Sequence, residues 1–108
     1  MSGERQQASD YKLRRELRYP IDEVSRLRNQ GAYSVEVRIR DVSTSGFMAE
    51  CVEPVRIGSL VKLDVPGLGG IEAQVRWQIG ARMGGMFIDP ISLGACEWTA
   101  TRSGPALD

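Results

Sequence analysis

The chain has 108 residues, a length that fits one small domain with a single hydrophobic core. Fourteen lysine and arginine residues balance fourteen aspartate and glutamate residues, so the molecule as a whole is not attracted electrostatically to nucleic acid or to a membrane. Histidine is absent and the two cysteines lack metal-ligand spacing, which removes the commonest general base and the commonest kind of zinc site. Enzymes therefore rank low among the candidate functions, and no metal is expected.

The first 18 residues are predicted to form a flexible N-terminal arm. Residues 1–11 are polar and without period, and they contain no hydrophobic run that would suit a signal peptide. Residues 12–18 read Lys-Leu-Arg-Arg-Glu-Leu-Arg, so basic charge gathers where the arm ends. No stretch approaches the length of a membrane span. We expect a cytoplasmic protein with reduced cysteines and no membrane contact.

Six strands are predicted after the arm, because segments that alternate between apolar and polar residues, and a last segment that is mainly apolar, are separated by turn residues. The segments lie at residues 20–26, 35–40, 47–51, 61–65, 71–79 and 82–88. The longest alternation places Val75 and Trp77 on the same apolar side of its strand. Two consecutive glycines, Gly84 and Gly85, indicate a bend or a close backbone approach in the last strand.

A short helix is predicted near the C-terminus, with Ser92 as a possible N-cap and Cys96 among the residues of its apolar face. Strands at such regular spacing favour an antiparallel barrel or a sandwich, and the helix would cover one end. The expected organisation is a mainly β domain at 19–101, between the arm at 1–18 and a tail at 102–108.

Arg14 and Arg18 stand four residues apart near the end of the arm. On a helical turn they would project from the same face, and in an irregular segment they could still converge on one ligand. The planar guanidinium group can donate two parallel hydrogen bonds to a phosphate or to the O6 and N7 edge of guanine. Taken alone, however, such a pair is far more often a solvated basic segment.

The segment Asp41-Val-Ser-Thr-Ser-Gly46 lies between two predicted strands, where an ordinary turn would use the same residue types. In a functional interpretation, three residues of the segment would take part in ligand binding. Asp41 would accept hydrogen bonds from the N1 and N2 donors of a guanine, Ser43 would add a hydroxyl partner, and Gly46 would permit a backbone bend or a close approach. For the segment by itself, the ordinary turn is the more frequent case.

Together, the two motifs resemble the PilZ domain family of cyclic di-GMP receptors. In that family an Arg-x-x-x-Arg segment precedes a small barrel, and an (Asp/Asn)-x-Ser-x-x-Gly segment lies on its strands. Residues 75–77 and 83–87 also resemble two late strands of the family, and the resemblance covers residues 13 to about 90. With the predicted strands, it implies an all-β fold: a six-stranded antiparallel β-barrel with a flexible N-terminal arm and a short C-terminal helix.

The resemblance implies a bacterial receptor that binds cyclic di-GMP and has no catalytic activity or cofactor. Arg14 and Arg18 would contact phosphates and guanine edges, with Arg15 as an additional donor. Asp41, Ser43 and Gly46 would form the part of the site that reads one guanine.

Two residues leave the details of ligand binding open. Trp77 would supply a stacking wall for the ligand, or it would fill the barrel core, which is at least as common for an aromatic residue on a strand. Leu13 stands where some family members carry a further arginine that stacks on a second ligand molecule. An intercalated ligand dimer is therefore less favoured here.

The resemblance also implies that the signal leaves by protein contact. The ligand would order the arm against the barrel and create a surface for an unidentified protein partner, as in motility, exopolysaccharide or surface-attachment machinery. One alternative is a PilZ-like adaptor that binds no nucleotide. Another is a barrel that binds single-stranded nucleic acid through the arm arginines and Trp77, and the zero net charge and the few aromatic residues argue against it. An enzyme ranks third, because no base that could activate a serine is visible near Asp41.

Overall fold

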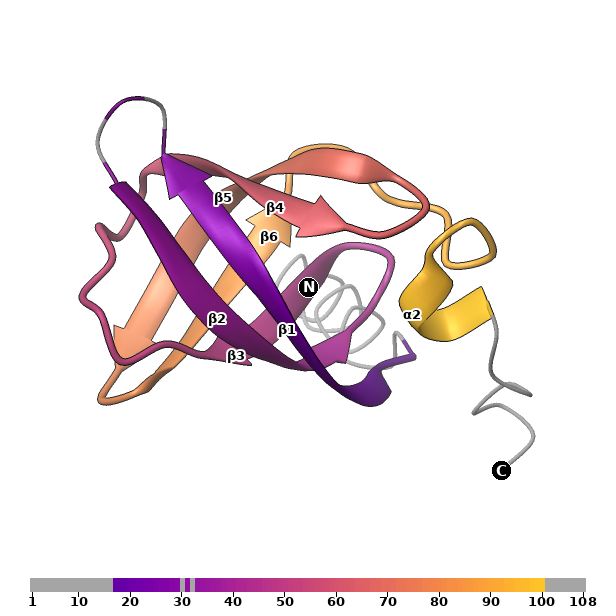
Figure 1. The fold of residues 1–108 in the computed structure, drawn as a ribbon, viewed down its shortest axis with the longest axis horizontal. Helices are drawn as coiled ribbons and strands as arrows, with labels where there is room; N and C mark the ends of the chain where they lie inside the picture. The colour runs from indigo at the N-terminus through magenta and orange to yellow at the C-terminus, as the bar shows by residue number, and fades with distance from the viewer. Residues whose placement is uncertain (1–16, 30, 32, 101–108) are drawn as a thin grey trace, which may run out of the picture.

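In a computed structural model, the chain folds into a closed β-barrel of six strands with a short helix at one end (Figure 1). The structure describes residues 17–29, 31 and 33–100. The elements are β1 Tyr19–Asn29, β2 Tyr33–Val42, β3 Gly46–Glu50, β4 Leu60–Val65, β5 Gly69–Ile79, β6 Arg82–Phe87 and α2 Glu97–Ala100. All neighbouring strands pair antiparallel, so the predicted all-β barrel is confirmed.

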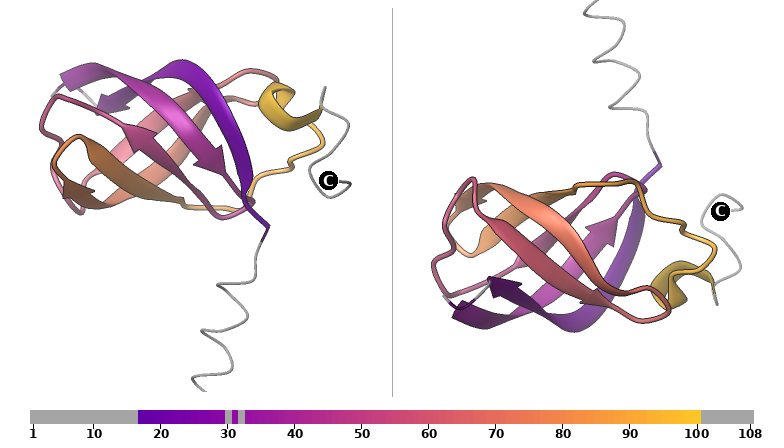
Figure 2. Two further views of the ribbon diagram at one scale, coloured as in Figure 1. Left: turned by 90° about the horizontal axis from the view of Figure 1, so that it is seen from below. Right: turned by 90° about the horizontal axis from the view of Figure 1, so that it is seen from above.

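The strands close in the order β1-β2-β3-β6-β5-β4 and return to β1. The views in Figure 2 show the strands wrapping around a common interior, with α2 at one open end. In this ring the β3–β6 pair lies opposite the seam between β1 and β4. The seam is short, because the described residues form only the register pairs Leu27↔Leu63 and Arg28↔Lys62 there. The β3–β6 pair and the β1–β4 seam therefore mark two opposite sides of the barrel.

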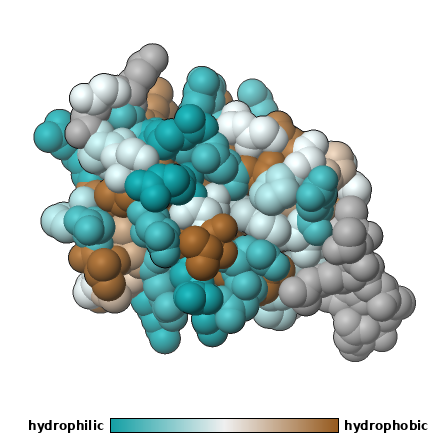
Figure 3. Space-filling view, in the orientation of Figure 1, coloured by the Kyte–Doolittle hydropathy of each residue, from teal (hydrophilic) through white to brown (hydrophobic). Residues whose placement is uncertain are grey.

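One core fills the barrel, built by the inward residues of all six strands. Leu27, Ile39, Leu63 and Met83 are fully buried, and the rings of Phe47 and Phe87 pack with their centroids 5.6 Å apart. The outer side of β1 and β2 is mostly hydrophilic, with separate apolar patches (Figure 3). This contrast between the two faces of each strand explains the alternation in the sequence.

The C-terminal helix is shorter than predicted, since α2 begins only at Glu97. Ser92 instead stabilises a turn before the helix, where its hydroxyl accepts a hydrogen bond from the Ala95 N–H at 3.3 Å. The helix nevertheless covers an end of the barrel, as expected, because Cys96 and Trp98 belong to the core and are 0% and 6% exposed. None of the described helices is long and apolar enough to cross a membrane.

The two cysteines are expected to resist thiol reagents in the native protein. Both are free and buried, and burial raises the pKa of the Cys51 thiol, whose S–H donates to the Glu53 carbonyl at 3.2 Å. We expect negligible reaction with a chromogenic disulfide reagent near pH 8 and full reaction of both thiols in denaturant. Rapid labelling of the folded protein would contradict the packing at these positions.

Candidate functional site

Asp41 lies just after a β-bulge that turns its side chain out of the barrel. Ile39 points into the core, and strict alternation would bury Asp41 as well. The register between β2 and β3 shifts between these two residues, so that Arg40 is the extra residue. Asp41 then lies on the outer face opposite Met48, and Val42 takes the buried position at 0% exposure. The bulge thus exposes a carboxylate at the end of a core strand.

Trp77 is turned outward by a second bulge in the same way. Val75 is buried, and the register between β5 and β6 shifts between Val75 and Trp77, with Arg76 as the extra residue. Trp77 is 37% exposed, and Ile79 beyond it is 75% exposed. The interpretation of Trp77 as a core aromatic is therefore wrong, because the bulge reverses the alternation on which it was based.

The two outward residues belong to one lateral row across four strands. Asp41 pairs with Met48, Met48 with Gly84, and Gly84 with Trp77, and directly paired residues lie on the same face of a sheet. We call these four residues the outer row. Three strand spacings of about 4.8 Å give it a length of about 14 Å. A carboxylate and an indole thus stand at the two ends of one surface.

Gly84 forms the floor beneath the indole of Trp77. A Cβ atom on Gly84 would collide with Nε1 and Cε2 of the tryptophan, so the ring lies directly on the glycine. The two glycines thus make room for side chains that lie close to the backbone of β6, because Gly85 provides the same space inward for the ring of Phe47. Met48 and Gly84 could not be recognised from the sequence as parts of this surface, because only the strand register aligns them with Asp41.

Arg18 is bonded to Asp41 and so connects the two sequence motifs. Pro20 is the register partner of Asp41 on β1, which brings the preceding residues beside the outer row. Nη1 of Arg18 lies 2.5 Å from Oδ1 of Asp41, and the two side chains are 57% and 21% exposed. The other predicted arm residues, Arg14 and Arg15, lie outside the described residues. Only the second arginine of the arm motif is therefore placed by the structure.

Ser43 is almost fully buried in the turn between β2 and β3, with 1% exposure. Its hydroxyl oxygen accepts hydrogen bonds from the N–H groups of Ser45 at 3.3 Å and Gly46 at 3.2 Å. Its own N–H donates to the Gly46 carbonyl at 2.8 Å. The serine therefore shapes the turn that follows Asp41, and a contact between its hydroxyl and a ligand stays a prediction.

Gly46 allows β3 and β6 to approach closely. A Cβ atom at this position would lie 2.5 Å from the carbonyl oxygen of Gly85, the neighbour of its partner Met86. Its backbone is not in the left-handed region that favours glycine. The glycine is thus required by strand packing, two residues before Met48 of the outer row.

Charged residues beside the outer row form a network of exposed ion pairs. Nη1 of Arg38 donates to Oδ1 of Asp22 at 2.6 Å, and this hydrogen bond lowers the pKa of the Asp22 carboxyl below its usual value. Arg40 lies 3.7 Å from Asp22 and 3.8 Å from Glu50. These cations are already balanced by carboxylates. No group of metal-binding side chains occurs among the residues that the structure describes.

Comparison with known protein families finds a match to one domain family. The family model for the PilZ domain matches residues 12–98, a span that contains the Arg14–Arg18 motif, the Asp41–Gly46 motif and Trp77. None of the curated proteins compared with the chain matches it. The match covers most of the chain, including the whole barrel from β1 to β6.

Proposed function

Because the chain belongs to the PilZ domain family, a family of cyclic di-GMP receptors, we propose that it binds cyclic di-GMP on the outer face of β2, β3, β6 and β5. The observation that carries the proposal is the bond between Arg18 and Asp41, which joins the arm motif to the strand motif. Neither motif alone would support it. Their contact produces one site that has both a guanidinium group and a carboxylate.

The proposed recognition follows from the chemistry of the ligand, a dianion with two guanine bases. The Asp41 carboxylate accepts hydrogen bonds from the N1 and N2 donors of one guanine. Arg18 then leaves Asp41 and donates to a phosphate or to the O6 and N7 edge of a guanine. On ligand binding, a guanine thus replaces the guanidinium group of Arg18 as the hydrogen-bond partner of Asp41. Arg14 and Arg15 are assigned to phosphates and guanine edges by the family resemblance.

The proposed consequence of ligand binding is that the N-terminal arm becomes ordered against the barrel. The ligand contacts arginines of the arm and a carboxylate of the barrel at once, so it favours states in which residues 1–18 rest on the barrel. The covered barrel and the arm together form a new surface for a protein partner. Leu13 favours one ligand molecule over an intercalated pair.

A calorimetric titration with cyclic di-GMP tests the proposal. Micromolar or tighter binding to the native chain supports it, and the melting temperature should rise with ligand concentration. Absence of heat and of any thermal shift with well-folded protein would overturn the proposal in favour of a nucleotide-free adaptor. Oligonucleotide binding that weakens steeply with salt and persists in the presence of cyclic di-GMP would favour a nucleic-acid-binding barrel.

Trp77 is expected to report ligand binding by fluorescence. It is 37% exposed at the end of the outer row, whereas the other tryptophan, Trp98, is buried at 6%. If a guanine stacks on the indole, the ligand quenches its emission, and Trp77→Phe removes most of the quenching. Trp77→Ala should weaken binding roughly tenfold, as expected for one lost base stack. Trp98→Phe is the matched control and should keep the quenching. Full quenching in Trp77→Phe would show that the indole is not part of the site.

A further inference from the structure

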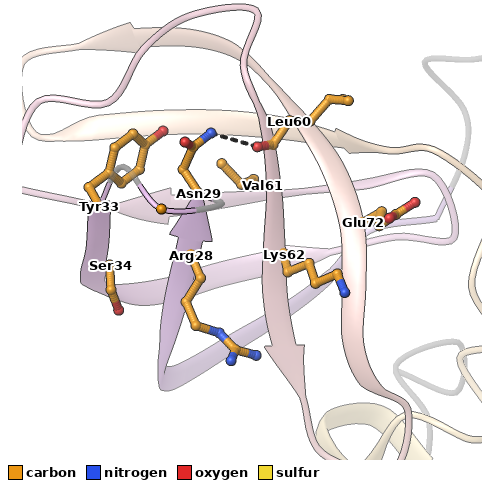
Figure 4. Close-up of a pocket in the computed structure, with 9 residues that line it drawn as sticks. Arg28, Asn29, Tyr33, Ser34, Leu60, Val61, Lys62 and Glu72 are labelled. Carbon is orange, nitrogen blue, oxygen red and sulfur yellow. Dashed lines mark hydrogen bonds between the residues drawn. The ribbon is translucent and has the colours of Figure 1, made fainter.

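We propose that a groove on the opposite side of the barrel binds an extended segment of a partner protein that carries one acidic residue beside a large apolar one. The groove has a volume of about 690 Å³ and lies between the β1–β2 hairpin and the start of β4 (Figure 4). Its walls include Arg28, Asn29, Tyr33, Leu60 and Lys62. The volume falls within the range of protein binding pockets.

The position of the groove leaves it free when the candidate cyclic di-GMP site is occupied. In the order of the barrel, the β1–β4 seam is three strands away from the β3–β6 pair in either direction. Asp41 lies at the end of β2, whereas Tyr33 and Ser34 of the groove lie at its start. A partner held in the groove would therefore not compete with the ligand.

The groove exists because β1 and β4 separate beyond the pair Arg28↔Lys62. After this pair no further register pair joins the two strands among the described residues. The Leu60 carbonyl accepts a hydrogen bond from Nδ2 of Asn29 at 2.8 Å, so a side chain replaces a main-chain partner. Where a strand carbonyl is hydrogen-bonded only by a side chain, a main-chain N–H of an extended peptide can replace that side chain as the donor. This favours an extended segment as the occupant.

The charges of the groove favour a carboxylate near its centre. Ser34, Arg28, Lys62 and Glu72 form a second outward row across β2, β1, β4 and β5. Arg28 is already paired with Asp64, which lies outside the groove. Lys62 forms no salt bridge with any residue in the described part of the chain. A partner carboxylate would give Lys62 the ion pair that it lacks.

Glu72 limits how much negative charge the groove can accept. It is the register partner of Lys62 on β5, so it repels a second carboxylate placed beyond the lysine. This argues against a polyanion such as nucleic acid and for a peptide with one acidic residue at the Lys62 position. Leu60 is 61% exposed and Tyr33 is half-buried, and they offer an apolar contact next to it. The occupant therefore combines an acidic residue with a neighbouring large apolar one.

Selection of random peptides on the folded native chain tests the proposal. We expect the selected peptides to share an acidic residue beside a large apolar residue. Lys62→Glu should weaken their binding roughly tenfold, and changing the acidic residue of the peptide to lysine should restore binding to this variant. Leu60→Ser is a second variant that keeps the charge and should also weaken binding. Arg82→Glu, an exposed charge reversal on the other side of the barrel, is the matched control.

Binding of the selected peptides can also be tested independently of the proposed cyclic di-GMP site. Asp41→Ala should retain peptide binding whether or not the chain binds cyclic di-GMP. No enrichment of peptides, or binding that Lys62→Glu and Leu60→Ser leave unchanged, would overturn the proposal. The proposal would also be overturned if small molecules bind in the groove but no peptide binds there.

Discussion

Replacing Asp41 with alanine is expected to weaken cyclic di-GMP binding about 100-fold or more. The carboxylate can accept two hydrogen bonds from one guanine, and a hydrogen bond to a charged group contributes about 1.5–3 kcal/mol. A loss of about 3 kcal/mol corresponds to a factor of roughly 100 in the dissociation constant. The free Arg18 of the variant can still contact a phosphate, so some binding persists at high ligand concentration. A calorimetric titration measures the change directly.

Asp64→Ala is the matched control for this prediction. Asp64 is also a surface carboxylate paired with an arginine, Arg28, although its side chain is 45% exposed against 21% for Asp41, and it lies at the β1–β4 seam on the other side of the barrel. Its loss should leave cyclic di-GMP binding unchanged. Because exposed ion pairs contribute little to stability, both variants should stay folded with similar melting temperatures. Equal binding by Asp41→Ala and the native chain would exclude Asp41 from the site.

Replacing Gly46 with alanine is expected to destabilise the barrel by about 3 kcal/mol. The new Cβ would lie 2.5 Å from the Gly85 carbonyl oxygen, and this atom belongs to the backbone of β6. No rotamer change can relieve the contact, so β3 and β6 must move apart and lose part of their ladder. The melting temperature should fall by roughly 10–20 °C, measured by circular dichroism or calorimetry.

Gly70→Ala is the matched control, because Gly70 is also a strand glycine outside the left-handed region. A Cβ at Gly70 would meet its nearest atom, Nη2 of Arg28, at 3.5 Å, which is an ordinary contact. This variant should melt at the native temperature or slightly above it. If Gly46→Ala melts like the native chain but loses ligand binding, Gly46 serves a close approach of the ligand instead of strand packing.

The fold could largely be predicted from the sequence because most strands keep one apolar face. Val61, Leu63 and Val65 alternate with polar residues in β4, and all three are buried. The helix was predicted too long. The N–H groups of Ala95 and Cys96 donate to Ser92 in a turn, and α2 begins only after this turn. Alternation identifies a strand wherever neighbouring residues face opposite sides of a sheet.

The candidate site could be predicted only in part. The two motifs located Asp41 and Arg18, which the structure joins, and Ser43 and Gly46, which it places in and after the turn. Trp77 could not be assigned, because alternation alone predicts an inward side chain and a bulge is not visible in the pattern. The direct partners of Asp41 and Trp77 in the outer row, Met48 and Gly84, lie on the next strands along the chain, and only the pairing of Met48 with Gly84 joins segments that are distant in sequence.

The sequence by itself determined the all-β barrel, its core and the identity of the two motifs, since these depend on local alternation and on residue type. The tertiary structure decided which side chains meet. It turned Asp41 and Trp77 to the same outer face, placed Arg18 on Asp41 and separated β1 from β4 to form the groove. These outcomes depend on two bulges between consecutive strands and on the β3–β6 and β1–β4 pairings, which join segments that are distant in sequence. The free energy that fixes a register comes from the whole closed barrel, so no single segment encodes it.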